Sequence, residues 1–68
     1  MSYKVICPDS SELINRYRCV INGNEVVAIG DNKKPVLSKC LRFANRGYYT
    51  ELWYTHSSGK SVLCQYWN

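Results

Sequence analysis

Four cysteines in a chain of 68 residues constrain this fold more than any other feature of the sequence. A chain of this length buries only about 60% of the surface that its unfolded form exposes, so a hydrophobic core alone leaves it marginally stable. Cysteines at this density predict a disulfide framework, and four of them allow three pairings. They are Cys7, Cys19, Cys40 and Cys64. The sequence therefore predicts one domain, residues 1–68, in an oxidising, extracellular compartment.

Zinc is the competing use of cysteine. No two cysteines are spaced as Cys-x2-Cys or Cys-x4-Cys, and the single histidine cannot complete a Cys2His2 set. We therefore expect neither a metal site nor a cofactor. No apolar run approaches the length of a membrane span, so we expect no membrane partner. Residues 1–7 do not resemble a signal peptide, and we expect that a leader has been removed from the mature chain.

Positive charge is the second global feature. Nine Lys or Arg residues against five Asp or Glu give a net charge of +4, which favours acidic partners. The main cluster is Lys33 with Lys34, followed by Lys39, Arg42 and Arg46. Clustered cations of this kind suit phosphate or RNA, and the alternative is a solvated surface without a ligand.

The N-terminal third predicts a helix after a short β-prone segment, residues 3–7. Asp9 is placed to cap the helix, with Glu12 three residues later, and Asn22–Gly23 supplies a stop. The apolar residues between them recur at the helical period: Leu13, Ile14, Tyr17, Val20 and Ile21. The alternative is a hairpin of residues 16–21 and 25–29, because Asn-Gly is also a strong hairpin signal. The capping residues favour the helix. Residues 12–21 distinguish the two alternatives, because they are helical in one and extended in the other.

The rest of the chain predicts strands. Residues 25–29 are apolar on both faces, as in an inner strand, and residues 35–43 are a second strand candidate. Residues 48–56 and 60–67 are aromatic and β-branched, with Ser57–Gly59 between them, which is typical of a hairpin. The predicted fold class is α+β, with one N-terminal helix packed on a twisted antiparallel sheet.

Three short motifs carry a resemblance to a known family: Pro35–Ser38, Ala44–Arg46 and Leu52–Cys64. In this order and spacing the chain resembles the secreted guanyl-specific ribonucleases of fungi. The resemblance implies that Arg46 and His56 occupy catalytic positions and that Cys7 and Cys64 join the two ends of the chain. Cys19 and Cys40 would then tie helix to sheet, with a free Cys19 as the alternative.

The catalytic glutamate of that family has no counterpart here, because its position is taken by Lys33. A lysine stays protonated at neutral pH and cannot act as the general base, so the vestigial positions Lys33, Arg46 and His56 predict no catalysis. An incomplete site of this kind is similar to the ribonuclease-like effectors that cereal powdery mildews deliver into plant cells. That resemblance implies a secreted, monomeric virulence protein that binds host protein or RNA. It also implies recognition by a plant immune receptor.

The expected binding residues are Lys33, Lys34, Arg46, Tyr54 and His56. Alternation along residues 48–56 puts Tyr54 and His56 on one face, which the family turns toward its substrate, so Tyr54 is expected to be exposed there. Two alternatives stay open: an active ribonuclease or ribotoxin, and an all-β sandwich like the two-disulfide effectors or toxins of other plant-pathogenic fungi.

Overall fold

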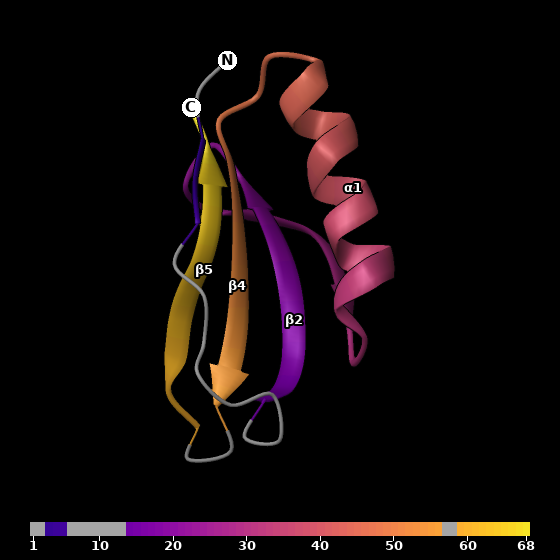
Figure 1. Ribbon diagram of the computed structural model, residues 1–68. Helices are drawn as coiled ribbons and strands as arrows, with labels where there is room; N and C mark the ends of the chain where they lie inside the picture. The colour runs from indigo at the N-terminus through magenta and orange to yellow at the C-terminus, as the bar shows by residue number, and fades with distance from the viewer. Residues whose placement is uncertain (1–2, 6–13, 57–58) are drawn as a thin grey trace.

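The structure is a computed structural model that describes residues 3–5, 14–56 and 59–68. The described elements are β1 (Tyr3–Val5), β2 (Ile14–Ile21), β3 (Glu25–Gly30), α1 (Lys33–Asn45), β4 (Thr50–His56) and β5 (Ser61–Trp67). The strands form one antiparallel sheet in the order β1-β5-β4-β2-β3. Helix α1 packs on one face of this sheet, against β2, β3 and β4 (Figure 1). The predicted α+β class is confirmed, and the all-β alternative is wrong.

The helix predicted over residues 12–21 is wrong where the structure describes it, because residues 14–21 are strand β2. Asp9 and Glu12, on which the capping argument rested, lie outside the described residues. In β2 Tyr17 and Cys19 are buried and belong to the core, and Val20 and Ile21 are buried as well. The hairpin alternative, with β2 paired antiparallel to β3, is correct.

The turn between β2 and β3 depends on Asn22 and Gly23. Both have positive φ, 56° and 82°, a left-handed conformation that asparagine tolerates and glycine adopts without strain. The backbone N–H of Asn24 closes the turn by donating to the carbonyl of Ile21 at 3.2 Å. The same two residues are typical of a helix end, so this dipeptide alone does not distinguish the two structures.

The strand predicted over residues 35–43 is also wrong, because these residues belong to helix α1. Val36, Cys40 and Ala44 recur every fourth residue and are buried, which gives the helix one apolar stripe. Pro35 is tolerated because it lies in the first turn, where backbone N–H groups have no partner within the helix. At the other end, the N–H groups of Arg46 and Gly47 donate to the carbonyls of Phe43 and Ala44.

The core lies between α1 and the sheet. Besides the helix stripe, it contains Tyr17, Cys19, Leu52, Tyr54, Cys64 and Trp67. Thr50 is buried beside them, and its hydroxyl donates to the carbonyl of Tyr48 at 2.9 Å. This bond removes most of the cost of burying a hydroxyl.

Two further strand predictions have different outcomes. The predicted C-terminal hairpin is confirmed as β4 and β5, which pair antiparallel from Thr50 opposite Trp67 to Thr55 opposite Ser61. The predicted strand at residues 25–29 exists as β3, but its inner position is wrong, because β3 lies at the edge of the sheet. Val26 and Ile29 are accordingly 54% and 59% exposed.

Candidate binding surface

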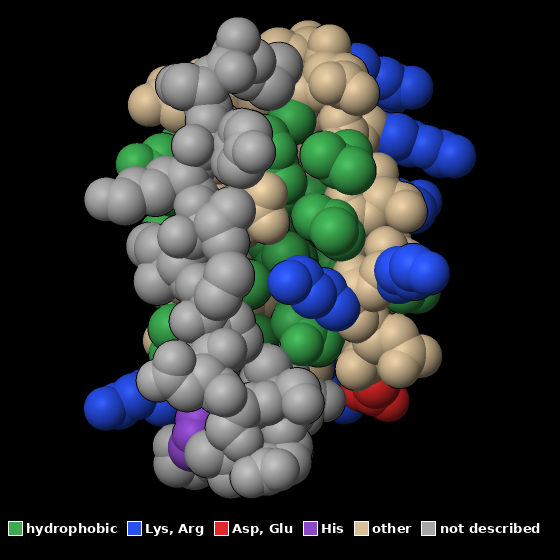
Figure 2. Space-filling view, viewed as in Figure 1, with side chains coloured by type: hydrophobic (Ala, Val, Ile, Leu, Met, Phe, Trp, Pro, Cys, Tyr) green, Lys and Arg blue, Asp and Glu red, His purple; other side chains and the backbone are tan. Residues whose placement is uncertain are grey.

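Helix α1 and the residue after it carry the densest positive charge of the chain. Five of the nine Lys and Arg residues fall within residues 33–46, and this segment contains no Asp or Glu. They are Lys33, Lys34, Lys39, Arg42 and Arg46. Figure 2 shows Lys and Arg side chains gathered along the α1 side of the molecule. The helix therefore offers a positive surface opposite its buried stripe.

Lys39, Arg42 and Arg46 lie on one side of the helix, because residues three and four apart are neighbours on a helix surface. We call these three residues the cationic flank. All three are exposed. Within the described residues, the ion pair of the structure joins Arg16 and Asp31. None of the three cations of the flank therefore forms an ion pair with a described carboxylate. Lys34 lies about 120–140° around the helix from Arg46 and Lys39 and about 80° from Arg42, outside the cationic flank.

The cationic flank faces the free edge of β3. Lys39 lines a hollow of about 210 Å³ together with Pro35 and Val36 of the helix and Ala28 and Gly30 of β3. The floor of the hollow is therefore largely apolar, and its rim carries both a cation, Lys39, and a carboxylate, Asp31, which pairs with Arg16 at 3.7 Å. Gly30 packs closely on the helix here, since a Cβ at this position would lie 3.3 Å from Cγ2 of Val36, and that side chain would have to shift by a few tenths of an ångström.

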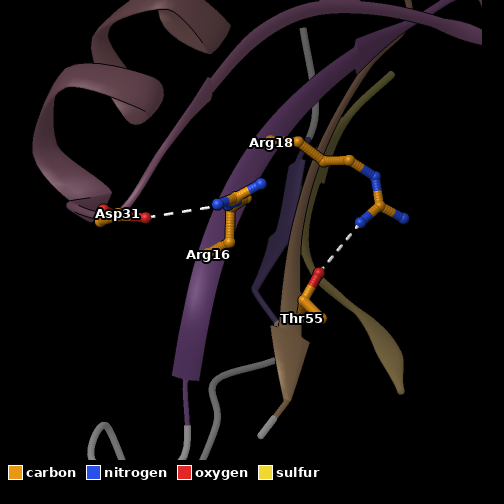
Figure 3. Close-up of polar contacts among 4 residues, drawn as sticks. All are labelled: Arg16, Arg18, Asp31 and Thr55. Atoms are coloured by element: carbon orange, nitrogen blue, oxygen red, sulfur yellow. Dashed lines mark hydrogen bonds and ion pairs between the residues drawn. The ribbon is translucent and has the colours of Figure 1, made fainter. Parts of the chain in front are cut away.

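A separate polar network covers the sheet face opposite α1. The guanidinium of Arg18 lies 5.5 Å from the ring centroid of Trp53, and Nη1 of Arg18 donates to Oγ1 of Thr55 at 3.4 Å (Figure 3). Nε1 of Trp53 and the hydroxyl of Tyr49 donate to the two carboxylate oxygens of Glu51 at 2.9 Å and 2.7 Å. Trp53 is thus held between a cation and a carboxylate.

Glu51 stabilises the protonated form of the Tyr49 hydroxyl. Its hydrogen bond raises the pKa of Tyr49 above the ordinary value of 10.0, with smaller contributions from burial and from the carboxylate charge. Because the pKa is raised in the folded state, this contribution to stability is complete below pH 10 and is lost as the pH rises through the higher, folded value.

Replacing Glu51 with glutamine tests this network. The amide lacks the negative charge and offers one acceptor oxygen, so we expect the pKa of Tyr49 to fall toward 10 and the stability advantage near neutral pH to shrink. NMR titration of the Tyr49 ring carbon measures this directly, with Tyr48 as an internal control. An unchanged Tyr49 pKa in Glu51→Gln would contradict the assignment.

The structure does not bring the predicted site residues together. Lys33 and Arg46 lie at opposite ends of α1, about 20 Å apart along the axis. Arg46 precedes β4 and His56 ends it, so a strand of about 20 Å separates them. Tyr54, predicted to be exposed, is 7% exposed and packs in the core, so that prediction is wrong. Lys34 and Arg46 are exposed on the helix as binding residues would be.

Lys39 and Arg42 are the two residues of the cationic flank that the sequence analysis does not include among the expected binding residues. Their spacing with Arg46, three and then four residues, is a helical signal, and it was hidden by assigning residues 35–43 to a strand. The turn predicted at Ala44–Arg46 is correct only at Arg46, which follows α1, because Ala44 and Asn45 are the last two residues of the helix. The strand implied at Pro35–Ser38 is helical, so the family role inferred for Lys33 has no structural counterpart.

Cys19 of β2 and Cys40 of α1 are buried, and their thiols lie 2.9 Å apart. The thiol of Cys40 donates to the carbonyl oxygen of Glu51 at 3.7 Å. Its interaction with Cys19, together with burial, raises the pKa of Cys40, and the same interaction lowers the pKa of Cys19. Cys64 is also buried in the core. Its predicted partner Cys7 lies outside the described residues.

Within the described residues, no group of three or more His, Cys, Asp or Glu side chains is placed to hold a metal ion. None of the helices in that part of the chain is long and apolar enough to cross a membrane. No protein-family model, curated protein sequence or solved structure matches this chain.

Proposed function

We propose that this protein is a non-catalytic binding protein that captures an acidic segment of a partner protein on the cationic flank of α1. The observation that carries the proposal is the alignment of Lys39, Arg42 and Arg46 along one side of a helix that has no acidic residue. Three neighbouring cations repel one another, and an acidic ligand relieves that repulsion. The net charge of +4 supports attraction of such a ligand from a distance.

Separation of the candidate groups supports a non-catalytic role. General acid and base groups must both reach the reacting atoms within hydrogen-bond distance. Arg46 and His56 are divided by the full length of β4, and Lys33 lies at the far end of α1 from Arg46. A single substrate phosphate cannot contact Lys33 and Arg46 together across about 20 Å of helix.

RNA is the second candidate ligand, because the cationic flank would also attract phosphates. Binding of single-stranded RNA usually adds exposed aromatic side chains on which bases stack. Here Tyr54 is buried, and Trp53 lies on the sheet face opposite α1, beside Arg18. Tyr48 is 40% exposed near Arg46 and packs edge-on against Phe43 of α1, but one ring offers less stacking surface than RNA binding usually uses. This favours an acidic protein segment over RNA.

The biological setting belongs to the same proposal. A small cysteine-rich chain with two buried thiols in contact suits secretion from a plant-pathogenic fungus and delivery into a host cell as a virulence effector. The acidic partner is then a host protein, and a plant immune receptor is a further expected partner. A relationship to ribonuclease-like effectors is supported by the β4–β5 hairpin and the turn at Arg46, although the helix implied before Gly23 is strand β2.

The test compares two labelled probes by fluorescence anisotropy: a glutamate-rich peptide and a single-stranded RNA of equal charge. We expect the peptide to bind more tightly, and its affinity to fall as salt rises from about 50 to 200 mM. Lys39→Glu should weaken peptide binding about tenfold, because one attraction becomes a repulsion. Lys34→Glu changes the charge equally outside the cationic flank and is the matched control.

Three results would contradict the proposal. The first is RNA binding that is tighter than peptide binding. The second is an equal loss of affinity in Lys34→Glu and Lys39→Glu, which would show that only net charge matters. The third is cleavage of total RNA that disappears in His56→Ala, since this would make the protein an enzyme.

A further inference from the structure

Strand β3 has an open outer edge. It is the last strand of the sheet, paired on its inner side with β2, and no described strand lies beyond it. An edge of this kind presents backbone N–H and C=O groups that a further strand can pair with. Lysine, proline and β-bulges often protect such edges. Glu25–Gly30 contains no lysine or proline, and its register shift at Val27 leaves Glu25–Val26 and Ala28–Gly30 in regular pairing with β2. The edge is therefore available to an added strand.

The cationic flank borders this same edge. Pro35, Val36 and Lys39 line the hollow beside Ala28 and Gly30, which fixes the side of the helix that faces the edge. The chain reverses at Asp31–Asn32, so α1 runs back along β3, and Arg42 and Arg46 follow Lys39 toward the Glu25 end. A strand added to β3 would have two faces, one of them on the same side of the sheet as α1. The side chains on that face would lie beside the cationic flank.

The opposite face of the same edge is apolar. Ile29 is paired with Arg18 and Val26 with Val20, so both side chains lie on the sheet face away from α1. Val26 and Ile29 are more than half exposed. A strand added beside them would bury part of this apolar surface, which favours binding.

We infer that the acidic ligand binds by strand addition: an extended segment of the partner pairs with β3 as a sixth strand. Its acidic side chains face the cationic flank, and the alternate side chains, which are apolar, face Val26 and Ile29. The recognised pattern is therefore acidic and apolar residues in alternation. This inference rests on the proposed function and adds the binding mode and the sequence pattern of the ligand.

A second copy of this chain is a less suitable occupant of the edge. Pairing β3 with β3 of another copy would place the two cationic flanks on the same side of the joined sheet, with Lys39 of each copy bordering the new junction. Each copy carries a net charge of +4, so the two would repel. An acidic segment replaces this repulsion with attraction.

The experiment uses the intact protein and three peptides of the same composition: alternating glutamate and valine, the same residues in two blocks, and the alternating peptide with N-methyl groups on every second amide. N-methylation removes backbone donors without changing charge. We expect the alternating peptide to bind best and both other peptides to lose at least about tenfold in affinity. Amide NMR shifts should change along residues 25–30 and not along β1, at the other edge of the sheet.

Protein variants complete the test. Lys39→Glu and Arg46→Glu should each weaken binding of the alternating peptide, while Lys34→Glu should not. Ile29→Thr keeps a β-branched residue and removes apolar contact, so a few-fold loss is expected without loss of fold. Circular dichroism of each variant checks that the fold is intact.

The outcomes separate this inference from the proposed function. If all three peptides bind equally and depend on Lys39, the protein binds acidic segments but not by strand addition, and the inference is overturned alone. If no acidic peptide binds, both the inference and the proposed function are wrong. The apparent molecular mass of the protein is also measured. If it grows with protein concentration and does not change on adding peptide, β3 pairs with a second copy, which also overturns the inference.

Discussion

Replacing Leu52 with alanine is expected to lower the free energy of unfolding by about 3 kcal/mol. Leu52 is fully buried in the centre of β4, where it packs between α1 and the sheet. Truncation leaves a cavity that close-packed neighbours fill only in part. A chain of this length has roughly 3–10 kcal/mol of stability in total, so Leu52→Ala should be close to unfolding at room temperature.

Urea unfolding followed by tryptophan fluorescence measures the effect, because Trp67 lies in the same core. Leu41→Ala is the matched control, since Leu41 is 43% exposed on α1 and its loss should cost below about 1 kcal/mol. If the two variants lost equal stability, α1 would not pack on β4 as described.

Oxidation of Cys19 and Cys40 to a disulfide is expected to stabilise the protein by about 3 kcal/mol over the reduced form. The two thiols lie 2.9 Å apart, so side-chain rotations suffice to form the bond. The bond would close a loop of about twenty residues that contains β3, and much of its effect arises from restricting the unfolded chain. It remains a prediction that these two cysteines are bonded in the mature protein.

The reaction uses oxidised glutathione, which takes up the two electrons and two protons that the thiols lose. Cys19 is the expected nucleophile, because its interaction with Cys40 lowers the pKa of Cys19 and favours its thiolate. Urea unfolding with and without reductant measures the stabilisation, and non-reducing peptide mapping identifies the pair. In Cys40→Ala the difference assigned to this bond should vanish. Peptide mapping that joins Cys40 to a cysteine other than Cys19 would show that the assignment is wrong.

These two predictions depend on elements that sequence reasoning placed differently. Cys19 was expected on a helix and Cys40 on a strand, and the structure reverses both. A bond between them would still tie a helix to the sheet, because each cysteine is the buried residue of its own element. The expected pairing of Cys19 with Cys40 therefore survives the exchange of helix and strand, although the predicted position of the helix does not.

The same error hid the candidate surface. Lys39, Arg42 and Arg46 are scattered over both faces if residues 35–43 are extended, and they become neighbours only on a helix. The sequence indicates Lys34 through charge and Arg46 through charge and the family resemblance, and both are exposed, whereas Tyr54, indicated by strand alternation and the resemblance, is buried. Charge clustering is visible in a sequence, but the face on which each side chain lies depends on the element that carries it.

The sequence by itself determined the β4–β5 hairpin and a chain reversal at Asn22–Gly23, because both depend on local chemistry: β-branched and aromatic residues, and a backbone that tolerates positive φ. The predicted α+β class is correct although the helix and one strand are exchanged, because one helix beside several strands gives this class wherever the helix lies. Only the tertiary structure decided which segment is the helix. Residues 14–21 fit a helical and an alternating pattern equally well, and they are extended because β3 and β4 supply hydrogen-bond partners on both sides. The partners of a strand lie far along the chain, so no local pattern reveals them.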